Sequence, residues 1–103
     1  MLNSTRFLAD SGLYYVAEDD GAIVGAAHTG FNADRRWEFR SLWVLDDHQG
    51  RHIGTRLTTL AIEPLIRLGR TPIYCEVKEP KMHEILKKLP EDMRRHLEIV
   101  PVY

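Results

Sequence analysis

The chain has 103 residues, 44% of them hydrophobic and 28% charged, with a formal net charge of −1, which predicts one globular domain and no nucleic-acid partner. The only cysteine, Cys75, leaves no partner for an internal disulfide or a cysteine-based zinc site, and the histidines are too scattered for a metal cluster. No apolar run reaches the roughly 20 residues of a membrane span, and the N-terminus lacks a signal-peptide layout, so we expect a cytoplasmic protein without a membrane partner.

The N-terminal part of the chain predicts a short helix followed by a β-hairpin. Ser4 or Thr5 is a suitable N-cap for a helix that ends before Gly12. Residues 13–18 and 22–29 are rich in apolar and β-branched types, so both segments are expected to be strands. The Asp-Asp-Gly sequence between them predicts the hairpin turn, because Asp-Gly tolerates positive φ.

The stretch from residue 37 to residue 68 organises the rest of the chain. It reads as an apolar strand (37–44), a loop rich in glycine and basic residues (46–54), and an amphipathic helix from Thr55. Strict alternation in the strand places Glu38, Arg40, Leu42 and Val44 on one face and Trp37, Phe39, Ser41 and Trp43 on the other. The helix is expected to face the sheet with Leu57, Leu60, Ala61, Pro64, Leu65 and Leu68.

Glycine and proline residues delimit the elements that follow. Pro64 is expected to kink the helix and Gly69 to end it. Residues 71–77 predict a strand parallel to the strand 37–44, and Glu79-Pro80 opens a second helix over 81–89. The last predicted strand, residues 97–103, contains Pro101, which places it at an edge of the sheet. The apolar face of the second helix comprises Met82, Ile85, Leu86 and Leu89.

A strand that turns through glycines into a helix N-terminus is typical of an anion site. The first N–H groups of a helix have no partner within it, and the helix dipole adds about half a positive charge there. Gly50 and Gly54 allow the backbone to approach a ligand closely, and Arg51 and Arg56 offer charged contacts. We therefore predict a phosphate-binding loop. Neither a dinucleotide fingerprint nor a P-loop sequence is present.

The segment Gln49-Gly50-Arg51-His52-Ile53-Gly54 resembles the pyrophosphate motif of the GNAT N-acetyltransferases, Gln/Arg-x-x-Gly-x-Gly/Ala. Gln49 matches the first position and Gly54 the last, whereas His52 stands where that family usually has glycine. The resemblance covers roughly residues 13–89. It implies an α+β fold with a twisted, mostly antiparallel sheet and helices on its faces. It also implies a single domain, residues 1–103, which lacks most of the usual N-terminal strand and helix layer.

The resemblance further implies acetyl-CoA as co-substrate and assigns residues to it. The pantetheine arm would pair with the strand backbone, and the pyrophosphate would bind the loop and the helix start. These positions are Leu42, Trp43 and Val44 for the arm, and Gln49, Gly50, Arg51, His52, Ile53, Gly54 and Thr55 for the pyrophosphate. No metal is implied.

The catalytic groups are less fully matched. By resemblance the general base is a strand glutamate about eleven residues before the motif, which is Glu38 here; a plain strand glutamate paired with Arg36 or Arg40 is the alternative interpretation. The family's general acid is often a tyrosine on the second helix, but Leu86 occupies the expected place. Tyr74, His83 and Tyr103 are the other candidates for the acid.

These features favour an acyl-CoA-dependent N-acetyltransferase in which an amine attacks the thioester directly. The amine acceptor is not specified by the sequence. The alternative is a catalytically reduced GNAT-like module that serves in binding, structure or virion assembly, and a third hypothesis is a nucleotide-binding regulator. A homodimer is a further hypothesis, motivated by the short N-terminal layer and by the aromatic residues of the strands, of which Trp37, Phe39 and Trp43 are either core or interface aromatics.

Overall fold

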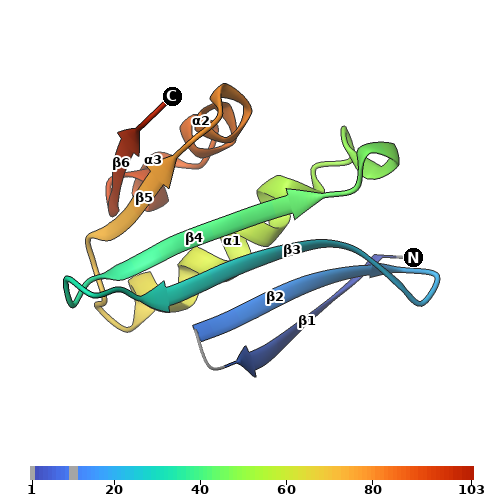
Figure 1. Ribbon diagram of the computed structural model, residues 1–103, viewed down its shortest axis with the longest axis horizontal. Coiled ribbons are helices and arrows are strands. Elements are labelled where there is room, and N and C mark those ends of the chain that lie inside the picture. Colours follow the sequence, from blue (N-terminus) through green and yellow to red (C-terminus); the bar gives the residue numbers. More distant parts are fainter. Residues whose placement is uncertain (1, 10–11) are drawn as a thin grey trace.

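The computed structural model describes residues 2–9 and 12–103, with side chains from Leu13 onward. A twisted six-stranded sheet in the order β1-β2-β3-β4-β5-β6 carries the helices (Figure 1). Neighbours from β1 to β4 are antiparallel, whereas β4, β5 and β6 are parallel. The predicted α+β fold, mostly antiparallel with a parallel crossover, is confirmed. The elements are β1 Leu2–Ala9, β2 Gly12–Asp19, β3 Ala22–Phe31, β4 Trp37–Val44, the 3-10 turn η1 Asp46–His48, α1 Ile53–Arg67, β5 Ile73–Val77, α2 Pro80–Lys87, α3 Glu91–Arg94 and β6 Leu97–Pro101.

The N-terminal helix prediction is wrong, because residues 2–9 form strand β1. This strand pairs antiparallel with β2 along its whole length, from Leu2 opposite Asp19 to Ala9 opposite Gly12. Eight residues are too few for a helix to be stable without packing, and pairing with β2 satisfies the backbone groups instead. The following hairpin is as predicted. Asp20 and Gly21 have φ of 51° and 79°, the two positive values of a type I′ turn.

Strand β4 does not alternate strictly, because it contains a β-bulge at Arg40. His28 of β3 pairs with Ser41 and Thr29 pairs with Phe39, so Arg40 has no opposite residue. One extra residue exchanges the two faces of the strand at this point. Trp37, Phe39, Leu42 and Val44 consequently pack on the core, and Ser41 and Trp43 are exposed. The predicted grouping of Leu42 and Val44 with Glu38 is therefore corrected.

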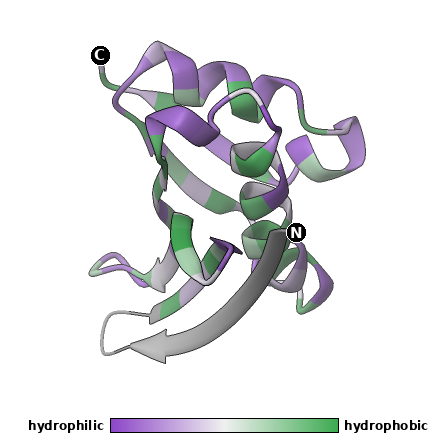
Figure 2. Cartoon of the chain, turned by 90° about the vertical axis from the view of Figure 1, so that its right-hand side faces the viewer, coloured by the Kyte–Doolittle hydropathy of each residue, from purple (hydrophilic) through white to green (hydrophobic). Residues whose placement is uncertain are grey.

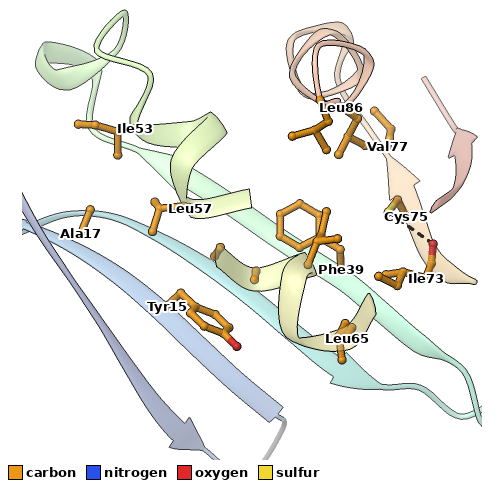
Figure 3. Packing of buried hydrophobic residues seen from close by; sticks show 14 of the residues in the cluster. Tyr15, Ala17, Phe39, Ile53, Leu57, Leu65, Ile73, Cys75, Val77 and Leu86 are labelled. Carbon is orange, nitrogen blue, oxygen red and sulfur yellow. Dashed lines mark hydrogen bonds between the residues drawn. The ribbon is translucent and has the colours of Figure 1, made fainter. Parts of the chain in front are cut away.

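Helix α1 covers one face of the sheet and supplies much of the core. Its buried residues recur every three or four positions: Ile53, Leu57, Thr58, Ala61, Ile62 and Leu65. Figure 3 shows side chains from α1 meeting those of β2, β4, β5 and α2. The predicted face was partly wrong, since Leu60 is 39% and Leu68 64% exposed. The helix continues through Pro64 to Arg67, and a kink there stays a prediction.

The C-terminal elements complete the sheet and the core. Leu86 and Leu89 of the α2 region are buried, as predicted, while the short helix α3 was not anticipated. Strand β6 lies at the edge of the sheet, as Pro101 indicated. Short hydrophobic and hydrophilic bands alternate along helices and strands, as expected for elements with one packed side (Figure 2). Within residues 2–9 and 12–103, no helix is long and apolar enough to cross a membrane.

Candidate functional site

The site is built where β4 and β5 separate. The two strands pair only at Glu38 and Tyr74, and from there they diverge (Figure 1). A cavity of about 540 Å³ lies beside the C-terminal half of β4, the loop after it, the start of α1 and α2. Its lining residues are Leu42, Trp43, Val44, His48, Gln49, Gly50, His52, Ile53, Gly54, Thr55, Glu79, Lys81, Met82, Glu84, Ile85 and Lys88. All residues predicted to bind acetyl-CoA except Arg51 are brought together here.

The loop presents a row of backbone donors at the start of α1. Among the hydrogen bonds of the described residues, none uses the backbone N–H groups of residues 50–55 as donors to protein atoms. The N-cap residue of α1 is His52; its side chain makes no capping bond, and no acidic residue stands in the first turn. Both observations leave the positive end of the helix dipole available to an anion.

Two residues of the loop have positive φ. Gly50 has φ of 86°, which glycine adopts without strain. His52 has φ of 61° and ψ of 20°, the left-handed helical region, at the motif position where the resembled family usually has glycine. The backbone geometry that glycine would supply is therefore kept, at a cost of about 1 kcal/mol for a residue with a Cβ atom.

Gly54 acts at a packing contact as well as in the loop. A Cβ atom at this position would lie 3.3 Å from Ile85 Cδ1 of α2 and 3.6 Å from Leu42 Cδ2 of β4. The absence of a side chain thus lets the first turn of α1 approach both elements. Sequence reasoning had assigned this glycine only to close approach of a ligand.

The side chain of Gln49 connects three parts of the site. Its Nε2 donates to the backbone oxygen of Val44 and to Asp46 Oδ1, both at 3.2 Å. Its Oε1 accepts a hydrogen bond from Lys81 Nζ of α2. The first residue of the motif therefore links the end of β4, the loop and the second helix, and Lys81 places a positive charge in the cavity lining.

A charged cluster outside the motif joins the loop to the β2–β3 hairpin. His48 Nε2 lies 3.0 Å from Asp19 Oδ2, and His48 Nδ1 lies 2.8 Å from Asp47 Oδ1. Arg51 Nη1 also donates to Asp19 Oδ2, at 3.2 Å, which accounts for its place outside the cavity lining. Hydrogen bonds to Asp47 and then to Asp19 raise the pKa of His48. The hydrogen bond with His48 is the main cause that lowers the pKa of both carboxyl groups.

Sequence reasoning missed the roles of Asp19 and His48. Asp19 was assigned to a hairpin turn and His48 to a basic loop, and 29 residues separate them. No local motif predicts such a contact. The only signal was that both residues flank turns that the fold could bring together.

The predicted catalytic glutamate is not in the cavity lining, to which β4 contributes Leu42, Trp43 and Val44. Glu38 is on the β4 face opposite to Phe39, its Oε1 is 3.2 Å from Arg40 Nε, and its side chain is 20% exposed. This ion pair agrees with the alternative interpretation of Glu38 as a plain strand glutamate paired with Arg36 or Arg40. Glu38 stands at the single position where β4 pairs with β5, at the closed end of the diverging strands.

The candidate acids are distributed over two places. Tyr74 lies opposite Glu38; burial, followed by a hydrogen bond to Glu76, raises the pKa of its hydroxyl. His83 Nδ1 and the Tyr103 hydroxyl lie 2.9 Å apart, and neither residue lines the cavity. Leu86, in the place expected for tyrosine, is 0% exposed. Of the candidate acids, Tyr74 is the one that the strand pairing places opposite the predicted base.

Two further observations concern other chemistries. Burial raises the pKa of the Cys75 thiol to about 12, so at neutral pH this sulfur is a protonated core atom rather than a nucleophile. In the described part of the chain, no group of three or more His, Cys, Asp or Glu side chains is arranged to hold a metal ion.

Comparison with solved structures finds the same fold. A Bacillus anthracis str. Ames protein assigned as a streptothricin acetyltransferase, solved in complex with acetyl coenzyme A, has a TM-score of 0.54 and 17% identity over 63% of this chain. An aminoglycoside acetyltransferase, HMB0005, from an uncultured soil metagenomic sample has a TM-score of 0.59 and 24% identity over 81% of this chain. The matches span 38% and 60% of the lengths of those two chains.

A search of curated proteins finds no match. The profile of the acetyltransferase (GNAT) family, however, matches residues 2–86, a range that includes β1, the motif loop and α2 up to Leu86. The family resemblance noted from the motif is confirmed by this match, and so is acetyl-CoA as the co-substrate of the family. The chain belongs to the GNAT acetyltransferase family.

Proposed function

We propose that this chain is an N-acetyltransferase that moves the acetyl group of acetyl-CoA onto an amine. The proposal is carried by one observation: among the residues that the structure describes, the backbone N–H groups of residues 50–55 have no protein acceptor, and these residues, apart from Arg51, line one cavity at a helix N-terminus. Such an arrangement suits the doubly charged pyrophosphate of acetyl-CoA. Lys81 and Lys88 also line the cavity, but Glu79 and Glu84 line it too, so the case for an anion rests on the backbone donors and not on side-chain charge.

The path of the ligand follows from the order of residues along β4. A pyrophosphate on residues 50–55 leaves the pantetheine arm to extend along the backbone from Val44 to Leu42, which lines the same cavity. Continued in that direction, the acyl end reaches the bulge and then Glu38. Divergence of β4 from β5 supports this path, because β4 residues beyond Glu38 have no partner strand on the β5 side.

The proposed reaction is a direct transfer. The amine nitrogen attacks the thioester carbonyl carbon, a C–N bond forms and the C–S bond breaks. Before the attack, the ammonium gives one proton to Glu38, directly or through one water molecule, which frees the nitrogen lone pair. The nitrogen of the tetrahedral intermediate then loses a second proton to water, and the departing sulfur takes a proton from Tyr74, which solvent restores. The position of Glu38 at the closed end of the diverging strands supports its assignment as the base. Tyr74 supports the acid role by standing opposite it.

The first experiment is a thermal shift of the purified protein with acetyl-CoA, CoA or ATP. At about a hundred times the dissociation constant, a ligand adds roughly 2.7 kcal/mol, which raises the Tm of a domain of this size by several degrees. We expect a shift with acetyl-CoA and CoA, and none with ATP. A protein that shows no shift with either CoA ligand would contradict the proposal.

The second experiment measures turnover in Glu38→Gln with a panel of amines. Loss of a general base is expected to reduce kcat by a factor of about 100 to 10,000, while acetyl-CoA binding is kept. Glu63→Gln, on the exposed face of α1, is the matched control and keeps full activity. An unchanged rate in Glu38→Gln would remove this residue from the mechanism.

One observation favours the alternative of a module with reduced catalysis. Leu86 is buried where the family often has its acidic tyrosine, so the acid function depends on Tyr74. If acetyl-CoA binds but neither the wild-type protein nor any variant acetylates an amine, the binding module becomes the better account.

A further inference from the structure

Turn η1 has little apolar anchoring of its own. None of its residues, Asp46, Asp47 or His48, is buried. Its internal backbone bonds are few, from His48 N to Leu45 O at 2.9 Å and from Gln49 N to Asp46 O at 3.3 Å. The loop conformation therefore depends on polar contacts made by its side chains.

The His48 ring is held from both sides. Asp47 of the loop and Asp19 at the end of β2 occupy its two ring nitrogens, and Arg51 shares the Asp19 oxygen. Among the described residues, these are charged groups that contact the ring or its Asp19 partner. Only 15% of the His48 side chain is exposed. A protonated imidazole donates to both carboxylates, whereas a neutral ring can donate to only one of them.

His48 lines the cavity but has no ring nitrogen left for a ligand. Its contribution to binding would therefore be indirect. It joins the hairpin to the loop one residue before Gln49, at the beginning of the row of unpaired backbone donors. A loosened His48 contact allows that row to move relative to β4, and a row of donors must be fixed to favour one anion geometry.

We infer that Asp19 and His48 are positioning residues for acetyl-CoA: they hold the loop of residues 46–52 on the β2–β3 hairpin, so that the backbone donors at 50–55 keep their ligand-binding geometry. The inference rests on the proposed function of the cavity. It assigns to the hairpin, which has no residue in the cavity lining, a part in co-substrate affinity.

The test is calorimetric titration of the whole protein with acetyl-CoA. His48→Gln and Asp19→Asn are each expected to weaken binding about tenfold at pH 7, as for loss of charge-assisted hydrogen bonds. His96→Gln, outside the cavity lining, is the matched control and binds as the wild type does. Asp19→Asn keeps the size of the side chain, so it decides the matter if His48→Gln does not fold.

The pH dependence separates positioning from a general structural effect. As pH rises above 6.5, wild-type affinity is expected to fall because His48, whose pKa is raised by its hydrogen bonds to Asp47 and Asp19, loses its proton. Affinity in His48→Gln stays level over the same range. Equal affinities of wild type and both variants at pH 7, or equal pH profiles, would overturn the inference alone. A wild-type protein that does not bind acetyl-CoA would overturn the proposed function, and the positioning role with it.

Discussion

The two ends of helix α1 are built in opposite ways. At the C-terminal end, Gly69 has φ of 71°, and its N–H donates to Ile66 O at 3.0 Å while the N–H of Arg70 donates to Leu65 O at 2.8 Å. This is a complete Schellman motif. At the N-terminal end, the N-cap residue His52 holds the left-handed conformation and its side chain makes no capping bond.

The difference separates stability from binding. A helix end that serves only the fold uses glycine and satisfies its own backbone groups. The N-terminal end contains a strained residue and leaves its backbone donors to water or to a ligand. The strain and the unpaired donors each lower the stability of the ligand-free protein. An end of this kind is expected where an anion binds. The contrast within one helix therefore locates the site without reference to any relative.

The largest expected effect on stability comes from the middle of the helix, because its packing on the sheet holds both ends in place. Leu57→Ala removes a fully buried side chain from the core and is expected to lower the free energy of unfolding by about 2–5 kcal/mol. Leu60→Ala, on the same helix but 39% exposed, is the control and costs less than about 1 kcal/mol. Urea denaturation measures both. Similar losses would mean that the corrected face of α1 is itself wrong.

The next largest effect on stability concerns the C-terminal end of α1. Gly69→Ala forces a Cβ atom into a left-handed residue and is expected to destabilise the protein by about 1 kcal/mol. No atom lies within 4 Å of the position where that Cβ would stand, so the effect is purely conformational. The midpoint of urea denaturation reports it. A variant as stable as the wild type would contradict the Schellman assignment.

The opposite change at the N-terminal end of α1 is expected to stabilise the protein. His52→Gly relieves the left-handed strain, and the gain of up to about 1 kcal/mol is reduced by the greater freedom of glycine in the unfolded chain. The same denaturation experiment compares it with Gly69→Ala, and the two variants should move the midpoint in opposite directions. A loss of stability in His52→Gly would show that the side chain itself contributes to the loop.

The smallest effect is the pH dependence of the stability that the charged cluster near the N-terminal end of α1 provides. The raised pKa of His48 gives stability that is complete below its ordinary value of 6.5 and is lost as pH rises through the folded value. The lowered pKa values of Asp19 and Asp47 give stability that is complete above 3.8 and is lost as pH falls. The stability difference between wild type and His48→Gln should therefore be greatest between pH 4 and pH 6.5. A difference that is constant with pH would exclude the cluster as its source.

Much of the fold followed from local signals. Asp-Asp-Gly fixed the hairpin, Gly69 fixed the end of α1, and the run 37–44 gave β4 with its observed bounds. The site loop was also predicted, because glycine spacing between a strand and a helix is itself a local pattern. These features are encoded within a few residues of where they act.

The features that were missed depend on distant partners. Residues 2–9 become a strand only because β2 is beside them, and the Asp19–His48 contact exists only in the folded sheet. The bulge at Arg40 is set by the register with β3, which nothing in the sequence of β4 announces. Tertiary pairing decided each of these against, or in addition to, local preference.

The bulge has a consequence for how related sequences should be aligned. Glu38 precedes Gln49 by eleven positions, and one of those positions is the unpaired Arg40. A homologue without the extra residue would present the same outward-facing side chain only ten positions before its motif. Counting back a fixed distance would then select a core residue as the base. An alignment gap at this point is therefore a change in strand geometry, and the outward face of β4 is the better guide to the position that corresponds to Glu38, the proposed base.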